Sequence, residues 1–139
     1  MGSNMSKNTI ISALNKIVRR RTIPFKFVFS SAMNVNAILT DIKKRKFSVV
    51  YLLHGDESYY IDLISDALEK EVLNDAQKGF DQTVLYGKDS SIVNIVNAAK
   101  RYPMMSDHQL IIIKEAQDLK WKSEEELLLK YVERPTPST

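Results

Sequence analysis

The sequence predicts an α/β protein with a parallel sheet and helices on both faces of that sheet. Short apolar runs typical of buried strands alternate with longer segments that carry apolar residues at helical spacing. Strands that alternate with helices form right-handed βαβ units, which bring the strands into one parallel sheet. The chain has 139 residues, of which 44% are hydrophobic and 27% are charged, as expected for one globular domain with a core.

The predicted elements follow in a regular order along the chain. Helices are expected over 35–42, 58–72, 92–99 and 123–132, and strands over 49–53, 80–86 and 110–113. Asn34 and Ser58 can cap the first two helices, and Ser123 opens a capping box for the last. Gly79 marks a turn before the second strand. Pro103 ends the third helix, because proline cannot continue a helical hydrogen-bond ladder.

The positive charge is concentrated at the start of the chain. Residues 1–32 contain six Lys or Arg residues and no acid, whereas residues 33–139 carry a small net negative charge. Four interpretations of this basic leader stay open: a tag or vector-derived start, translated sequence upstream of a natural start at Met33, a transit peptide, or a nucleic-acid-binding arm. We expect 1–32 to be poorly ordered and 33–139 to form the domain.

Several classes of protein are excluded by composition. The chain has no Cys and two His, which excludes disulfide scaffolds, thiolate zinc sites and cysteine nucleophiles and makes a His-rich metal site improbable. No uninterrupted apolar run is long enough to span a membrane. We therefore expect no metal, no membrane contact and a cytoplasmic location.

The first predicted strand is followed by residues at the position of a phosphate-binding loop. That loop would read Gly-x-x-x-x-Gly-Lys-Ser/Thr. Here Gly55 is followed by Asp56 and Glu57, which would repel phosphate, and Tyr60 and Ile61 stand where the second Gly and the Lys belong. The sequence predicts a degenerate nucleotide site that does not bind nucleotide.

A second obligatory position of a nucleotide hydrolase is also replaced. Lys114 directly follows the third strand, where an ATPase needs an Asp to hold Mg²⁺. The pair Asp56–Glu57 could act as acid and base, but carboxylates at a helix start are more often solvated. We predict no catalytic residue.

Two consecutive methionines lie between the third helix and the third strand. Met104 and Met105 follow Pro103 and fall outside any helical or strand period. From the residues alone, two interpretations stay open: the pair fills gaps in the core, or it forms an exposed, adaptable apolar contact for a partner.

Three segments together resemble a known family. Residues 51–62 (YLLHGDESYYID), 79–89 (GFDQTVLYGKD) and 103–114 (PMMSDHQLIIIK) resemble, in the same order, the delta subunit of bacterial DNA polymerase III, in the form found in the Bacteroidetes group. The similarity extends from about Met33 to the last residue. It implies an AAA+-like (RecA-type, P-loop NTPase-like) N-terminal domain. Because family members run on into a further core strand, we expect this domain to be truncated at its C-terminal end.

The resemblance also implies a function and a site. Delta is a non-catalytic clamp-loader subunit, accessory to a DNA-directed DNA polymerase, that binds no ATP, binds the sliding clamp (beta subunit) and helps open its ring. By position, Met104 and Met105 match the family's clamp-binding apolar pair, which often contains Leu or Phe. The rim of this contact would be Tyr102, Pro103, Ser106 and Asp107. The implied partners are the clamp, other clamp-loader subunits bound through C-terminal domains that are absent here, and DNA in the assembled complex; no cofactor is implied.

Two alternative functions remain. An atypical P-loop-like nucleotide hydrolase would be stabilised by ATP, because a ligand stabilises the folded state that binds it. A basic-arm nucleic-acid-binding module would lose affinity steeply with salt and on removal of residues 1–32.

Overall fold

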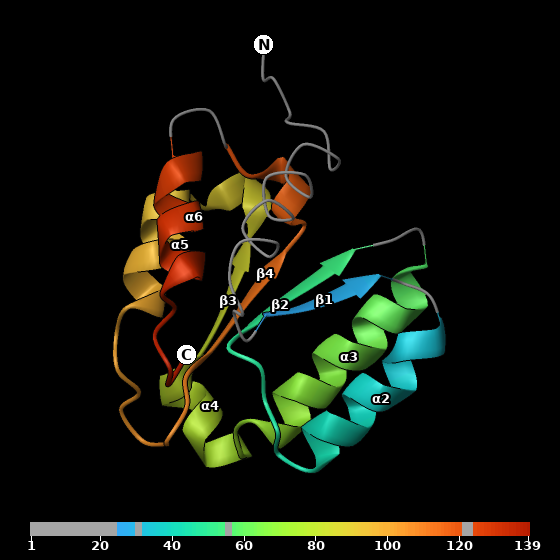
Figure 1. Ribbon diagram of the computed structural model, residues 1–139. Helices are drawn as coiled ribbons and strands as arrows, with labels where there is room; N and C mark the ends of the chain where they lie inside the picture. The colour runs from blue at the N-terminus through green and yellow to red at the C-terminus, as the bar shows by residue number, and fades with distance from the viewer. Residues whose placement is uncertain (1–24, 30–31, 55–56, 121–123) are drawn as a thin grey trace.

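The computed structural model describes residues 25–29, 32–54, 57–120 and 124–139 (Figure 1). The elements, in chain order, are β1 (Phe25–Phe29), α2 (Ala32–Lys43), β2 (Val50–His54), α3 (Ser58–Glu71), α4 (Asp75–Asp81), β3 (Gln82–Tyr86), η1 (Gly87–Asp89), α5 (Ile92–Ala99), β4 (Leu110–Lys114), η2 (Ala116–Asp118) and α6 (Glu125–Glu133). The expected α/β alternation is therefore present.

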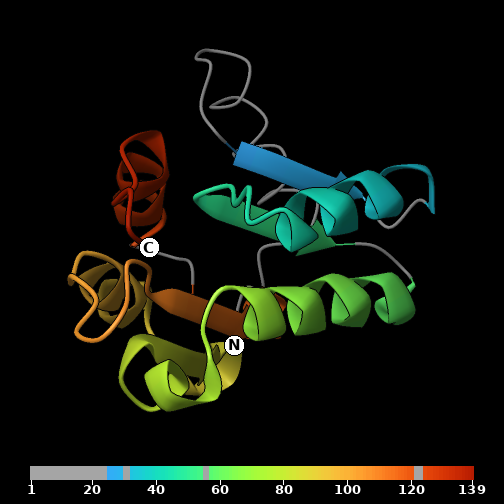
Figure 2. The ribbon, with the colours of Figure 1, turned by 90° about the horizontal axis from the view of Figure 1, so that it is seen from below.

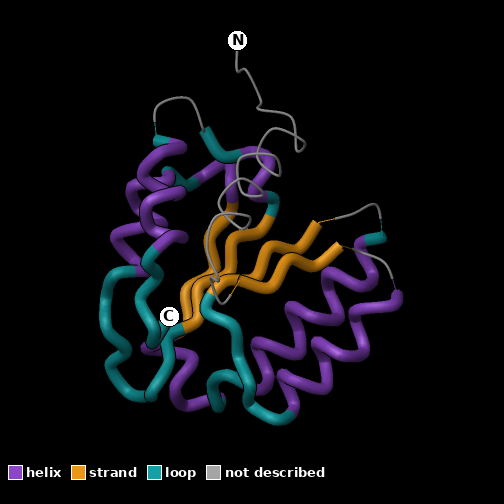
Figure 3. Tube along the Cα trace, in the orientation of Figure 1, coloured by secondary structure: helices purple, strands orange, loops and turns teal. Residues whose placement is uncertain are grey.

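The strands pair in parallel, as the alternation predicts. β1 runs beside β2 with Phe25 opposite Val50, and β3 runs beside β4 with Gln82 opposite Leu110. Within the described residues these pairs are two separate two-stranded sheets, not one continuous hydrogen-bonded sheet. Figure 3 shows the two pairs lying next to each other.

Helices lie on opposite sides of the strands. In Figures 1 and 2, α2 and α3 lie together on one side, and α5 and α6 lie together on the other. Each helix pair has its own core cluster. The cluster of α2 and α3 consists of Val35, Ile38, Ile42, Ile64, Leu68, Val72 and Leu73, and the cluster of α5 and α6 is centred on Ile92, Ile95, Val96 and Leu119.

One helix was not expected from the sequence. Residues 80 and 81 were expected to begin a strand, but they end helix α4, and β3 begins at Gln82. A capping box starts this helix: the Asn74 side chain accepts from the Gln77 N–H at 2.9 Å, and the Gln77 side chain accepts from the Asn74 N–H at 3.1 Å. Because the boundary between helix and strand lies between residues 81 and 82, Asp81 is the last residue of the helix.

The helix starts also differ in detail from the expected caps. Asn34 lies inside α2 instead of preceding it, because the helix begins at Ala32. Glu57, not Ser58, is the N-cap of α3, and Glu124 is the N-cap of α6. Ser123, expected to open the last helix, lies outside the described residues.

The sheet begins inside the segment expected to be a poorly ordered leader. Residues 25–29 form β1 and pair with β2 over five residue positions. These residues differ from the expected leader in that they pair in parallel with β2. The rest of the leader, residues 1–24, lies outside the described residues.

Candidate functional site: an apolar loop held by a buried aspartate

The loop of residues 102–107 connects α5 to β4 and presents apolar side chains to solvent. Tyr102 is 80% exposed, Met104 77% and Met105 58%. Methionine side chains that fill gaps in a core would be covered by neighbouring residues. The structure therefore places the Met side chains outside the core.

A buried carboxylate forms hydrogen bonds with the backbone of this loop. Asp81, the last residue of α4, is only 1% exposed. Its Oδ1 accepts a hydrogen bond from the Met104 backbone N–H at 2.5 Å, and its Oδ2 accepts from the Met105 N–H at 2.8 Å. The Ser106 hydroxyl lies 3.0 Å from the same Oδ2. Because both Met backbones face Asp81, the backbone is fixed while the Met side chains stay in solvent.

These hydrogen bonds keep Asp81 ionised in spite of its burial. Burial raises the pKa of the Asp81 carboxyl, but the hydrogen bonds from Met104, Met105 and Ser106 lower it by more. The net result is a pKa below the ordinary value of 3.8. Asp81 was not among the site residues expected from the sequence, because residue 81 was assigned to a strand and its partners lie more than twenty positions away.

The expected rim residues take different places. Tyr102 and Asp107 are exposed, whereas Pro103 and Ser106 are half-buried. The Ser106 hydroxyl points inward, within reach of both Asp81 and the His108 carbonyl, and donates its one proton to either. Ser106 therefore holds the loop together. His108 packs edge-on against Phe47, with ring centroids 5.9 Å apart.

The structure describes only part of the expected degenerate nucleotide loop. Gly55 and Asp56 lie outside the described residues. Glu57 is an exposed N-cap whose side chain makes no capping hydrogen bond. Tyr60 packs against the core of α2 and α3, Ile61 is half-buried, and Lys114 is exposed at the end of β4. The tyrosine at position 60 thus serves packing.

Other kinds of site find little support among the described residues. There, no group of three acidic or His side chains is arranged to hold a metal ion. Nor does the described part of the chain contain a helix long and apolar enough to cross a membrane.

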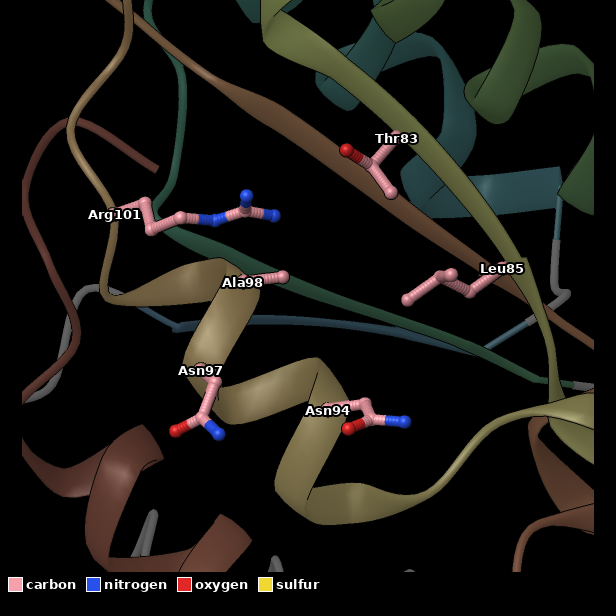
Figure 4. A pocket seen from close by; sticks show the side chains of 6 residues that line it. All are labelled: Thr83, Leu85, Asn94, Asn97, Ala98 and Arg101. Atoms are coloured by element: carbon pink, nitrogen blue, oxygen red, sulfur yellow. The ribbon is translucent and has the colours of Figure 1, made fainter.

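A pocket lies between β3 and α5 (Figure 4). It is lined by Thr83, Leu85, Asn94, Asn97, Ala98 and Arg101. Its lining contains one cation and no carboxylate or imidazole, so it offers no acid–base pair. None of the residues expected to bind a partner or a nucleotide lines this pocket.

Comparison with known proteins gives one consistent family. A family model described as DNA polymerase III, delta subunit, matches residues 51–139. The DNA polymerase III subunit delta of Bacillus subtilis (strain 168) is 24% identical over 105 residues, which cover 70% of this chain and 30% of that protein. The solved structure of the Bacillus subtilis DNA clamp loader delta protein superimposes with a TM-score of 0.67 at 22% identity, covering 76% of this chain and 33% of that one.

These matches show the family of the chain and how much of each relative the chain covers. The structural similarity shows a shared fold, and the chain spans about a third of the length of the two relatives. Both relatives come from Bacillus, so the expected likeness to the Bacteroidetes form stays a prediction. Since the family model covers more than half of the 139 residues, the chain belongs to the DNA polymerase III delta subunit family.

Proposed function

We propose that this chain is a non-catalytic clamp-loader module that binds the sliding clamp through Met104 and Met105. The observation that carries the proposal is the exposure of both Met side chains on a loop whose backbone is fixed by Asp81. Two adjacent exposed apolar side chains favour insertion into an apolar pocket of a partner. The partner is a sliding clamp because the chain belongs to the delta family.

The absence of catalysis is part of the same proposal. The fold is AAA+-like in this view, with its nucleotide site lost. Tyr60 packs into the core where a phosphate loop needs glycine, and Lys114 stands where Mg²⁺ needs a carboxylate. The ATP-driven steps of clamp loading then belong to other subunits, and this chain acts as an accessory subunit of the polymerase complex.

Ring opening would follow from binding preference. A subunit that binds the open clamp more tightly than the closed clamp shifts the population toward the open ring without consuming energy itself. Contacts with other clamp-loader subunits and with DNA belong to the same proposal; the matched region covers 30% of one relative and 33% of the other.

A binding titration against the sliding clamp of the same organism tests this proposal. The wild-type chain is expected to bind saturably, and a Met104→Ser, Met105→Ser double variant is expected to lose binding while keeping its circular dichroism spectrum. Val93→Ser is a matched control, because Val93 is an exposed apolar residue on α5, outside the loop. Equal binding by the double variant and the wild type would contradict the proposed site.

A further inference from the structure

The geometry points to Asp81 as a positioning residue for clamp binding: we propose that its buried carboxylate holds the 102–107 loop in the conformation that the clamp binds. This inference rests on the function proposed above and adds to it a residue that does not itself touch the clamp. Asp81 lies on α4, and the loop follows α5, so two segments distant in sequence meet here (Figure 1).

The backbone of the 102–107 loop is held mainly by Asp81. Residues 104–107 form a bend, and between Tyr102 and His108 no backbone–backbone hydrogen bond joins the loop to another described residue. The hydrogen bonds found there run from Met104, Met105 and Ser106 to Asp81, and from Ser106 to His108. Without Asp81, the amides of Met104 and Met105 would keep no partner among the described residues.

Among the described residues, the partners of the Asp81 carboxylate are hydrogen-bond donors of the loop. Within the described part of the chain, Asp81 forms no salt bridge with Lys, Arg or His. A buried carboxylate without a cation is retained only where hydrogen bonds compensate its lost hydration. Here the donors come from the loop, so the ionised state of Asp81 and the conformation of the loop depend on each other. The lowered pKa of Asp81 is consistent with this dependence.

A loop held by Asp81 should bind the clamp more tightly than a flexible loop. A flexible loop must be ordered when it binds, and this ordering weakens the complex, whereas a loop already held in its bound conformation avoids that cost. Asp81 fixes the backbone of both Met residues and leaves their side chains exposed. It therefore pre-organises the apolar pair without occupying any of the surface that the pair presents.

The test variant is Asp81→Asn, which keeps the shape of the side chain but places an amide NH₂ against a backbone N–H. We expect faster amide hydrogen exchange at Met104 and Met105 and an increase in the Kd for the sliding clamp of about 5- to 50-fold. The matched control is Ile42→Val, a buried change in the core of α2 and α3 that is expected to lower stability without changing the Kd. Circular dichroism shows that each variant is folded under the assay conditions.

A double-mutant cycle distinguishes positioning from general stability. If Asp81 acts through the Met pair, Asp81→Asn weakens clamp binding less in a Met104→Ser chain than in the wild type. Any of three results would overturn the inference: Asp81→Asn weakens clamp binding equally in both backgrounds, Asp81→Asn leaves the Kd unchanged, or Ile42→Val raises the Kd by the same factor as Asp81→Asn. If Asp81→Asn does not fold, Ser106→Ala is judged by the same criteria, because it removes one contact to Asp81 from a half-buried position.

Clamp binding by the wild-type chain separates the proposed function from the positioning role of Asp81. If the wild-type chain does not bind the clamp, the proposed function fails and the effect on affinity falls with it. If the wild-type chain binds and Asp81→Asn loosens the loop without changing the Kd, the clamp site stands and the positioning role is wrong.

Discussion

The two methionines should contribute unequally to clamp binding, in proportion to the surface that each can bury. Complete burial of a Met side chain contributes roughly 1.5–3 kcal/mol. Met104 is 77% exposed before binding, so Met104→Ser should remove about 1.2–2.3 kcal/mol, an increase in Kd of about 8- to 50-fold. Met105 is 58% exposed, so Met105→Ser should remove about 0.9–1.7 kcal/mol, an increase of about 4- to 20-fold.

The measured values should lie toward the lower end of these ranges. Each Met side chain also loses rotamer freedom on binding, at roughly 0.5–1.5 kcal/mol, and the Ser variants avoid that loss. The assay is isothermal titration of each single variant against the sliding clamp, with Val93→Ser as the exposed apolar control. A Met104→Ser chain that is folded and binds within about twofold of the wild-type Kd would refute the burial argument.

Two glycines, the pH dependence of Asp81 and the response to ATP give further tests. Gly87→Ala should lower the free energy of unfolding by about 1–3 kcal/mol, and with it the melting temperature, because the new Cβ would lie 2.1 Å from the Glu115 carbonyl oxygen. Gly79 lies in helix α4, and a Cβ at this position would have nothing within 4 Å. Gly79→Ala should therefore raise the free energy of unfolding by up to about 1 kcal/mol. A Gly87→Ala chain as stable as the wild type would show that this approach is not tight. Asp81 has a lowered pKa, so its contribution to stability is present above the unfolded pKa near 3.8 and is lost as the pH falls through the lower folded pKa. The gap in melting temperature between wild type and Asp81→Asn should therefore narrow on acidification below about pH 4, and a gap that widened would contradict the assigned sign. Saturating Mg-ATP should leave the melting temperature unchanged, whereas ATP at about 100 times its Kd would stabilise a nucleotide-binding chain by roughly 2.7 kcal/mol.

Elements with a strong local apolar pattern could be predicted from the sequence. The stripe expected on the helix after residue 58 includes Ile64 and Leu68, and both are buried in α3. The apolar run before Lys114 forms β4, paired in parallel with β3 as the alternation of elements predicts. In these segments the periodicity of a few neighbouring residues decides the structure, so no distant contact has to be known.

Elements that depend on weaker or distant signals were missed. The strand β1 lies in a segment whose lack of acids suggests a leader, and its pairing with β2 joins residues about twenty-five positions apart. Helix α4 had a local signal in the capping box of Asn74 and Gln77, but the apolar residues from Phe80 onward resemble a strand. A short helix followed directly by a strand leaves the boundary to be set by hydrogen bonds, which composition does not reveal.

In the candidate site, too, local features could be predicted and those that depend on distant contacts could not. Resemblance to the delta family selects Met104 and Met105, because the motif is local. Their exposure and their attachment to Asp81 could not be predicted, since both depend on how α4 packs beneath the loop. Ser106 was expected at the rim of the contact, but its hydroxyl points inward because it hydrogen-bonds to the buried Asp81 carboxylate. This orientation also depends on the packing of α4.

The expected nucleotide position and the 102–107 loop lie at opposite ends of strand β4. Small ligands of open parallel α/β proteins bind beyond the carboxyl ends of the strands, and Lys114 lies at that end of β4. The 102–107 loop lies before the amino end of the same strand, on the anchored connection from α5. The 102–107 loop is thus at the opposite end of β4 from the expected nucleotide position, so the proposed clamp contact does not depend on that position. In the proposed function, Tyr60 packs against the core of α2 and α3 beside the expected nucleotide loop, while Met104 and Met105 stay exposed on the 102–107 loop for the clamp.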